Sequence, residues 1–307
     1  MKHSRRARRS RTQKKQLVPM LLGIALLVVT LLSIFLIFLK QPSKQQSDSK
    51  ASTVETTTRS SVMTSESSEV QTEIIWEQQT EPIKLPILMY HAIHVMAPEE
   101  EANANLIVDP TTFESHLKAL QDAGYYTLSP EEAYNVLTEN VLPAGKKVVW
   151  LTFDDSLWDF YSYAYPLLKQ YQMKATNNVI TGFTEYGQAG HLNLDQIKEM
   201  QTAGLSFQGH TVNHPDLEYS SIEDQTNELT SSKAYLDSQL NQETIAIAYP
   251  GGRYSADTVA LTEQAGYKLG LTTNNGLASL ADGLLSLNRV RILPTTTGDG
   301  LISEISH

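Results

Sequence analysis

The 307-residue sequence contains no cysteine. This absence excludes disulfide bonds, a thiol nucleophile and any zinc site built on thiolates. Extracellular proteins that lack disulfides are more typical of bacterial surfaces than of the eukaryotic secretory pathway.

Two stretches near the N-terminus each lack one kind of charge. Residues 1–16 contain eight Lys or Arg and no acidic residue, and residues 17–39 contain no charge at all. A helix of 23 residues is about 35 Å long, enough to cross a bilayer. A cleaved signal peptide is the alternative, but its apolar region is only roughly 7–15 residues long and a small-x-small cleavage site follows it. We therefore predict a basic cytoplasmic tail (1–16), a single transmembrane anchor in the cell membrane (17–39) and an extracellular remainder.

Residues 40–80 have few apolar side chains and are rich in Ser, Thr, Gln and Glu. Such a composition cannot bury enough surface to fold and predicts a disordered stalk below a folded domain at 81–307. Beyond the basic tail, 16 basic residues face all 34 acidic ones, a formal charge of about −18. This balance argues against nucleic acid as a partner and is compatible with a neutral glycan.

The folded part alternates apolar runs with segments of helical periodicity. This alternation predicts a mainly parallel sheet with helices outside it, and the number of units favours an irregular α/β barrel. In such barrels the chemistry lies at the C-terminal ends of the strands. We expect strands at 84–93, 148–155, 174–181, 205–211, 244–250, 267–273 and 285–292, and helices at 110–124, 129–140, 158–172, 192–204, 222–240 and 255–266.

Two adjacent aspartates, Asp154 and Asp155, end the apolar run VVWLTF at 148–153. Adjacent carboxylates repel one another unless a positive group neutralises them. One interpretation is that both face solvent and cap the following segment. The other is that a cation binds there and that other strand ends supply its remaining ligands.

The segment GHTVNHPDL places His210 and His214 four residues apart after another predicted strand. Surface or capping histidines are the plain alternative. On a helical turn, however, this spacing puts both imidazoles on one face. Together with Asp155 they would give two nitrogens and one oxygen, leaving a fourth position for water, as in catalytic zinc sites. Asp154 would then lie beside the metal as a general base.

These motifs resemble those of the polysaccharide deacetylase family, also called carbohydrate esterase family 4 or the NodB-homology domain, over residues 83–293. The family's T-F-D-D motif supplies the base and one metal ligand, matching Asp154 and Asp155. Its H-S/T-x-x-H motif supplies two further ligands, matching His210 and His214. The resemblance implies zinc as cofactor, with cobalt or nickel used by some members.

Two other family motifs are altered. In the segment that corresponds to R-x-P-Y, AIAYPGGRY, Pro250 aligns, but Ala248 replaces the Arg that steadies the base and Gly251 replaces the Tyr. The late L-x-H motif, which supplies the general acid, has no counterpart, because LSLNRVRI carries Asn288 and Arg289 there. The backbone N–H groups of Gly251 and Gly252 remain candidates for an oxyanion hole, which needs no side chain.

Other candidate residues lie beside strand ends. The opening strand KLPILMYHAI fits a branch that resembles deacetylases of poly-N-acetylglucosamine and wall polymers. His91 in this strand is a candidate acid or substrate contact, or else a histidine that only bonds to backbone. Further candidates for substrate or oxyanion contact are Tyr249, Pro250 and Tyr254. Tyr90, Trp158 and Tyr254 are candidates for stacking on sugar rings, although aromatic residues beside strand ends often belong to the core.

The resemblance implies a membrane-anchored, metal-dependent de-N-acetylase that acts on N-acetylglucosamine units of a bacterial surface glycan. Peptidoglycan, poly-N-acetylglucosamine and the linkage unit of a wall polysaccharide all stay open as substrates. An O-acetyl esterase and a catalytically silent glycan-binding module are the alternatives.

Overall fold

The computed structural model describes residues 74–306. The predicted tail, the predicted anchor and most of the predicted stalk lie outside the described residues. Within 74–306, no helix combines the length and the apolar character that crossing a membrane requires.

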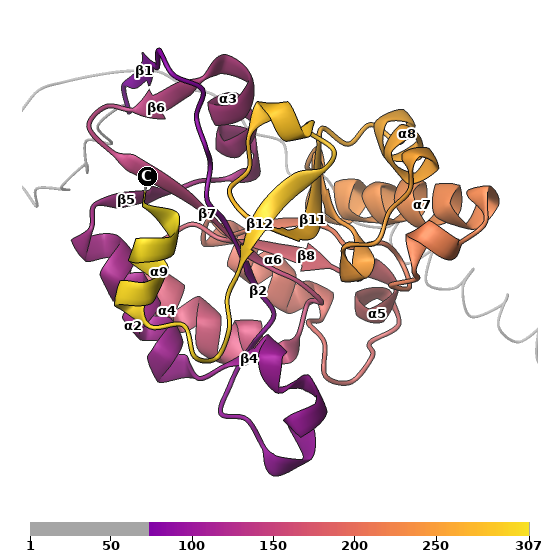
Figure 1. Ribbon diagram of the computed structural model, residues 1–307. Coiled ribbons are helices and arrows are strands. Elements are labelled where there is room, and N and C mark those ends of the chain that lie inside the picture. Colours follow the sequence, from indigo (N-terminus) through magenta and orange to yellow (C-terminus); the bar gives the residue numbers. More distant parts are fainter. Residues whose placement is uncertain (1–73, 307) are drawn as a thin grey trace, which may run out of the picture. The chain divides into compact units, whose positions relative to one another are not determined.

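Seven parallel strands form a closed barrel, which confirms the predicted fold (Figure 1). The order around the barrel is β2-β12-β11-β10-β9-β8-β7, and pairing of β2 with β7 closes it. β5 (Tyr125–Thr127) extends the sheet beyond β7. The barrel strands are β2 (Ile87–Tyr90), β7 (Lys147–Phe153), β8 (Thr176–Val179), β9 (Ser206–Gly209), β10 (Ala246–Ala248), β11 (Leu269–Asn275) and β12 (Leu287–Arg291).

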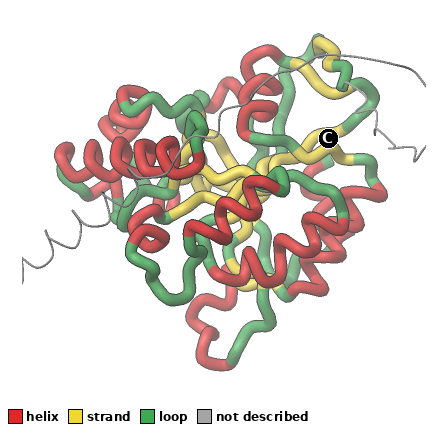
Figure 2. The backbone as a smooth tube through the Cα atoms, turned by 180° about the vertical axis from the view of Figure 1, so that it is seen from behind, coloured by secondary structure: helices red, strands yellow, loops and turns green. Residues whose placement is uncertain are grey.

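Helices surround the barrel (Figure 2), and they agree with the predicted segments. Ser129 and Glu132 form a capping box at the start of α3 (Pro130–Glu139), where the helix at 129–140 was expected to begin. The segment expected to be helical at 158–172 contains a π-helical stretch, η2 (Phe160–Ala164), shortly before Pro166, which has no N–H for a regular helical hydrogen bond. The predicted helices are α2 (Pro110–Asp122), α3 (Pro130–Glu139), α4 (Tyr165–Gln170), α6 (Leu194–Thr202), α7 (Ile222–Leu240) and α8 (Ala256–Gln264).

Several short elements were not predicted. Among them, β1 shows that the folded part begins before residue 81, so the prediction of disorder is wrong for Trp76–Gln78. This strand pairs with β6, and the Trp76 ring packs edge-on against Tyr126 at 6.3 Å. The strand expected at 84–93 is interrupted at His91, so that β2 is followed by β3 (Ala92–Ile93), which pairs with β4 (Ile107–Val108). The unpredicted elements are β1 (Trp76–Gln78), η1 (Pro98–Leu106), β4, β6 (Val141–Pro143), α5 (Thr181–Glu185), η3 (Leu217–Tyr219), η4 (Pro250–Gly252), η5 (Leu280–Asp282) and α9 (Gly298–Ile305).

Alternation along the strands divides the core into an inner and an outer part. In β7, Trp150 belongs to one apolar cluster, whereas Leu151 and Phe153 belong to the other. Since residues two apart in a strand share a face, Thr152 and Asp154 follow Trp150 on the inner side. The interior therefore changes from apolar to polar toward the C-terminal ends of the strands, where the chemistry was expected.

Candidate active site

The two aspartates lie where the chain leaves β7. Asp155 and Ser156 both have left-handed backbone conformations, with φ of 74° and 49°. Non-glycine residues rarely adopt this region, and such residues concentrate at functional sites. The turn separates the two carboxylates, so that Asp154 is buried and Asp155 is partly exposed.

Asp155, His210 and His214 lie together, as predicted. One oxygen of Asp155 is 3.2 Å from His210 Nε2 and 3.4 Å from His214 Nε2. Two ligands placed about 2.0–2.1 Å from a tetrahedral zinc are about 3.3–3.5 Å apart, so these donor atoms fit the ion. All three ligand atoms lie within 4.8 Å of one another.

The two histidines differ in how readily they give up a proton to a metal. His210 Nδ1 donates a hydrogen bond to the carbonyl of Ala248 at 2.7 Å, which leaves the lone pair of Nε2 for a metal. Burial and the neighbouring charge of His210 lower the pKa of His214. Burial by itself lowers the pKa of His210 as well, but its hydrogen bond to Asp155 raises it overall. A metal must displace that proton, so binding weakens as the pH falls.

The loop around the histidines differs from the helical turn that the spacing suggested. Thr211 and His214 have positive φ values of 65° and 59°, so residues 210–214 form an irregular turn. The Glu228 carboxylate accepts hydrogen bonds from the backbone N–H groups of Val212 and Asn213, and the Thr211 hydroxyl accepts one from that of His214. Hydrogen bonds to Glu228, outside the turn, and to Thr211, within it, therefore hold the turn that brings the two imidazoles together.

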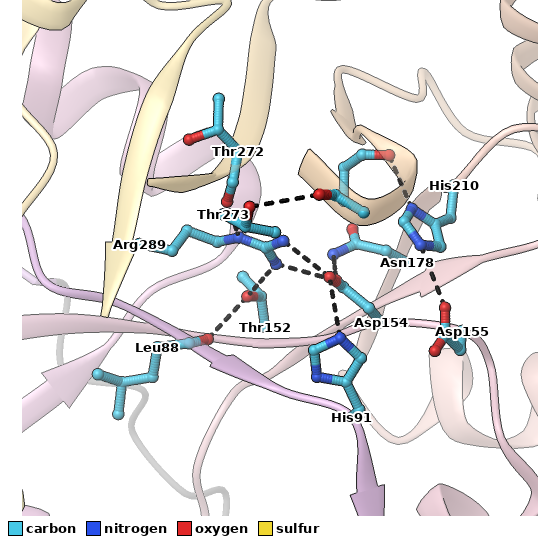
Figure 3. Close-up of polar contacts among 12 residues, drawn as sticks. Leu88, His91, Thr152, Asp154, Asp155, Asn178, His210, Thr272, Thr273 and Arg289 are labelled. Carbon is cyan, nitrogen blue, oxygen red and sulfur yellow. Dashed lines mark hydrogen bonds and ion pairs between the residues drawn. The ribbon is translucent and has the colours of Figure 1, made fainter. Parts of the chain in front are cut away.

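Asp154 is held by an arginine that the sequence reasoning missed. Both oxygens of Asp154 accept from the Arg289 guanidinium, at 2.9 and 2.7 Å, and Asn178 donates to one of them at 2.8 Å (Figure 3). Burial alone would raise the pKa of Asp154, but the charge and hydrogen bonds of Arg289 lower it well below its usual range. Asp154 is therefore ionised and fixed in orientation.

Ala248 stands where the resemblance implied an arginine at the third motif, and Arg289 of β12 contacts the Asp154 carboxylate instead. Arg289 is fully buried, and its Nε also donates to the Thr272 carbonyl at 2.7 Å. The sequence did contain a signal for this contact. Arg289 follows Leu287 by two residues, and residues two apart in a strand share a face, so both side chains lie on the inner face of the strand.

His91 lies in the same pocket, with Nε2 4.0 Å from an oxygen of Asp154. Burial lowers its pKa, so the ring is neutral near pH 7. It approaches Asp154 from a different side than Arg289 and Asn178 do (Figure 3).

The turn after β10 is less available to a substrate than predicted. Tyr249 is fully buried, and its hydroxyl donates to the Leu285 carbonyl at 2.9 Å. The N–H of Gly252 donates to the Tyr249 carbonyl at 2.8 Å, which removes it as an oxyanion donor. Pro250 is buried, and the Tyr254 ring stacks on Tyr249 at 5.2 Å.

The two other aromatic candidates differ in exposure. Tyr90 belongs to the core, where its hydroxyl contacts His116 Nδ1 at 3.1 Å, so it cannot stack on a sugar. Trp158 is 43% exposed beside the site.

Comparisons with known proteins point to one family. The family profile described as "Polysaccharide deacetylase" matches residues 141–270. The chain is 37% identical over 223 residues to YxkH of Bacillus subtilis, whose name assigns it to the polysaccharide deacetylases; the match covers 73% of this chain and 76% of that protein. It is 38% identical over 115 residues to the poly-β-1,6-N-acetyl-D-glucosamine N-deacetylase of Staphylococcus aureus, covering 35% of this chain and 38% of that one.

The fold is also shared with a solved structure. Streptococcus pyogenes deacetylase PplD in complex with acetate is 60% identical, with a TM-score of 0.71. The match covers 74% of this chain and the whole of that one.

Proposed function

Because this chain belongs to the polysaccharide deacetylase family, we propose that it is a zinc-dependent de-N-acetylase acting on N-acetylglucosamine units of a bacterial surface glycan. One observation carries the proposal. A buried carboxylate, Asp154, is clamped beside a set of three possible metal ligands whose donor spacing fits zinc. Similarity to an enzyme named for a poly-N-acetylglucosamine substrate supports the choice of sugar.

Each residue has a distinct part in hydrolysis of the acetamide. Asp155, His210 and His214 hold the metal, which when bound activates water and polarises the carbonyl. Asp154, kept ionised by Arg289, accepts a proton from the attacking water.

The remaining residues act on the oxyanion and on the leaving group. The backbone N–H of Gly251 stabilises the negative charge that develops on the carbonyl oxygen. His91 receives the proton from Asp154 and passes it to the leaving nitrogen. The products are acetate and a free amine on the sugar.

In this proposal, the N-terminal segments hold the catalytic domain at the outer side of the cell membrane. Residues 17–39 anchor the chain in the cell membrane, residues 1–16 remain in the cytoplasm, and a stalk ending before Trp76 carries the catalytic domain outside. Deleting residues 1–39 should move the protein from the membrane fraction to the soluble fraction after alkaline extraction. Retention of the shortened chain in the membrane fraction would contradict the anchor.

Acetate release by the full-length chain tests the reaction. We expect zinc-dependent acetate from N-acetylglucosamine oligomers, lost on chelation and in Asp154→Asn. Asp195→Asn, at an exposed position, is the matched control and should retain activity. Acetate released only from O-acetylated oligosaccharides would replace the proposal by an esterase. Zinc-loaded protein that binds glycans without releasing acetate would indicate a binding module.

A further inference from the structure

Trp158 forms an aromatic surface next to the candidate active site. It follows Asp155 by three residues, which limits the distance between their Cα atoms to about 11 Å. His94 follows His91 by the same interval, and the strands before them pair through Tyr90 and Phe153. Trp158 and His94 therefore meet at the seam where Asp154 and His91 also lie.

The indole of Trp158 is held in place from several sides. Its ring stacks on the His94 imidazole, with centroids 6.1 Å apart and planes 23° apart. The Tyr163 ring packs edge-on against the indole, with centroids 6.0 Å apart. The backbone N–H of Trp158 donates to the Gly190 carbonyl at 3.0 Å. Even so, 43% of the residue remains exposed to solvent.

The histidine behind the indole is itself fixed by two carboxylates. His94 Nδ1 lies 2.6 Å from an oxygen of the buried Asp159, and Nε2 lies 3.1 Å from both oxygens of Glu100. Asp159 also accepts a hydrogen bond from the backbone N–H of Ile93 at 3.1 Å. An exposed aromatic ring is thus supported by a hydrogen-bonded frame, an arrangement that lowers the entropic cost of binding a ligand.

We propose that Trp158, supported by His94, forms a sugar-binding subsite that takes the ring next to the unit being deacetylated. The C–H face of a hexosamine ring packs on an indole and removes apolar surface from water. This inference rests on the proposed function and extends it, because it makes the substrate an oligomeric glycan. Continuity with the candidate active site and the paired state of the nearby carboxylates favour a neutral sugar as the occupant.

Chain-length dependence of turnover tests the subsite. In the zinc-loaded full-length chain, kcat/KM is compared for N-acetylglucosamine and its tetramer, in both β-1,4 and β-1,6 linkages. A Trp side chain buries roughly 150–250 Å² when it is fully covered. Covering a quarter of that area with a sugar ring corresponds to a factor of about ten in affinity. Trp158→Ala should therefore reduce kcat/KM for the tetramer about tenfold more than for the monosaccharide.

Two further variants separate binding from folding. Trp158→Phe keeps an aromatic ring and should retain most of the preference for the tetramer. Tyr186→Ala, at a position that is 79% exposed, is the matched control and should leave the preference unchanged. Equal losses on both substrates in Trp158→Ala, or no loss on either, would overturn the subsite.

A binding measurement distinguishes this inference from the proposed function. Calorimetric titration of the tetramer into Asp154→Asn, with and without Trp158→Ala, needs no turnover. Affinity about tenfold weaker in the double variant supports the subsite, even if the wild-type chain releases no acetate. Absence of acetate release would count against the proposed function and not against the subsite. Equal affinities in the two variants would refute the subsite.

Discussion

Replacing Arg289 by Met should strongly destabilise the barrel, because the guanidinium compensates a buried carboxylate. Arg289 is fully buried and Asp154 nearly so, and the pair is joined by two hydrogen bonds. Removing one partner of a buried ion pair leaves an unpaired charge, at a cost of about 3–5 kcal/mol. For a domain of this size the melting temperature should fall by about 6–20 °C.

The assay is thermal unfolding of the metal-free full-length chain, followed by near-ultraviolet circular dichroism at pH 7. Arg291→Met is the matched control, since this arginine lies on the same strand but is partly exposed. Its effect should stay within about 0.5 kcal/mol. Combining Arg289→Met with Asp154→Asn should destabilise less than the sum of the two single changes, because both remove the same interaction. A melting temperature of Arg289→Met within about 2 °C of the wild type would refute the reasoning.

Three further predictions concern the ligands, the turn after β10 and the frame behind Trp158. His214→Ala should reduce bound zinc well below one ion per chain by elemental analysis, and an unchanged zinc content would exclude this residue as a ligand. Gly252→Ala should cost at least about 2 kcal/mol in chemical denaturation, because its Cβ would meet the Thr273 backbone N at 2.6 Å. Gly251→Ala, with a similar positive φ but only a side chain nearby, should cost less, and equal losses would contradict the steric argument. Partial burial by itself lowers the pKa of His94, but hydrogen bonds to its two carboxylate partners raise it overall. The contribution of protonated His94 to the stability of the fold is therefore complete below about pH 6.5, and it is lost as the pH rises through the raised pKa of His94. His94→Gln should lower the melting temperature more at pH 6 than at pH 9, and a pH-independent difference would contradict this assignment.

Local sequence determined the elements and part of the site. The strand before Asp154 and the helix expected at 129–140 each depend on residues within one segment, so the pattern alone predicted them. The sequence pattern also predicted the barrel, since alternating strands and helices have few ways to bury their apolar faces. The sequence alone predicted that three side chains lie close together, those of Asp155, His210 and His214, because they follow strands of a parallel sheet.

Only the tertiary structure decided what surrounds Asp154. Arg289 lies 135 residues away in the sequence and Asn178 lies 24 away, yet both donate to the same carboxylate. Periodicity shows that a strand residue faces inward, but it does not show which inward-facing side chains share a level, because that depends on strand order and register. The turn at Gly252 and the stack of Trp158 on His94 depend in the same way on contacts between distant segments. The sequence by itself therefore identified the charged groups and the barrel, and packing decided which groups neutralise, orient and cover one another.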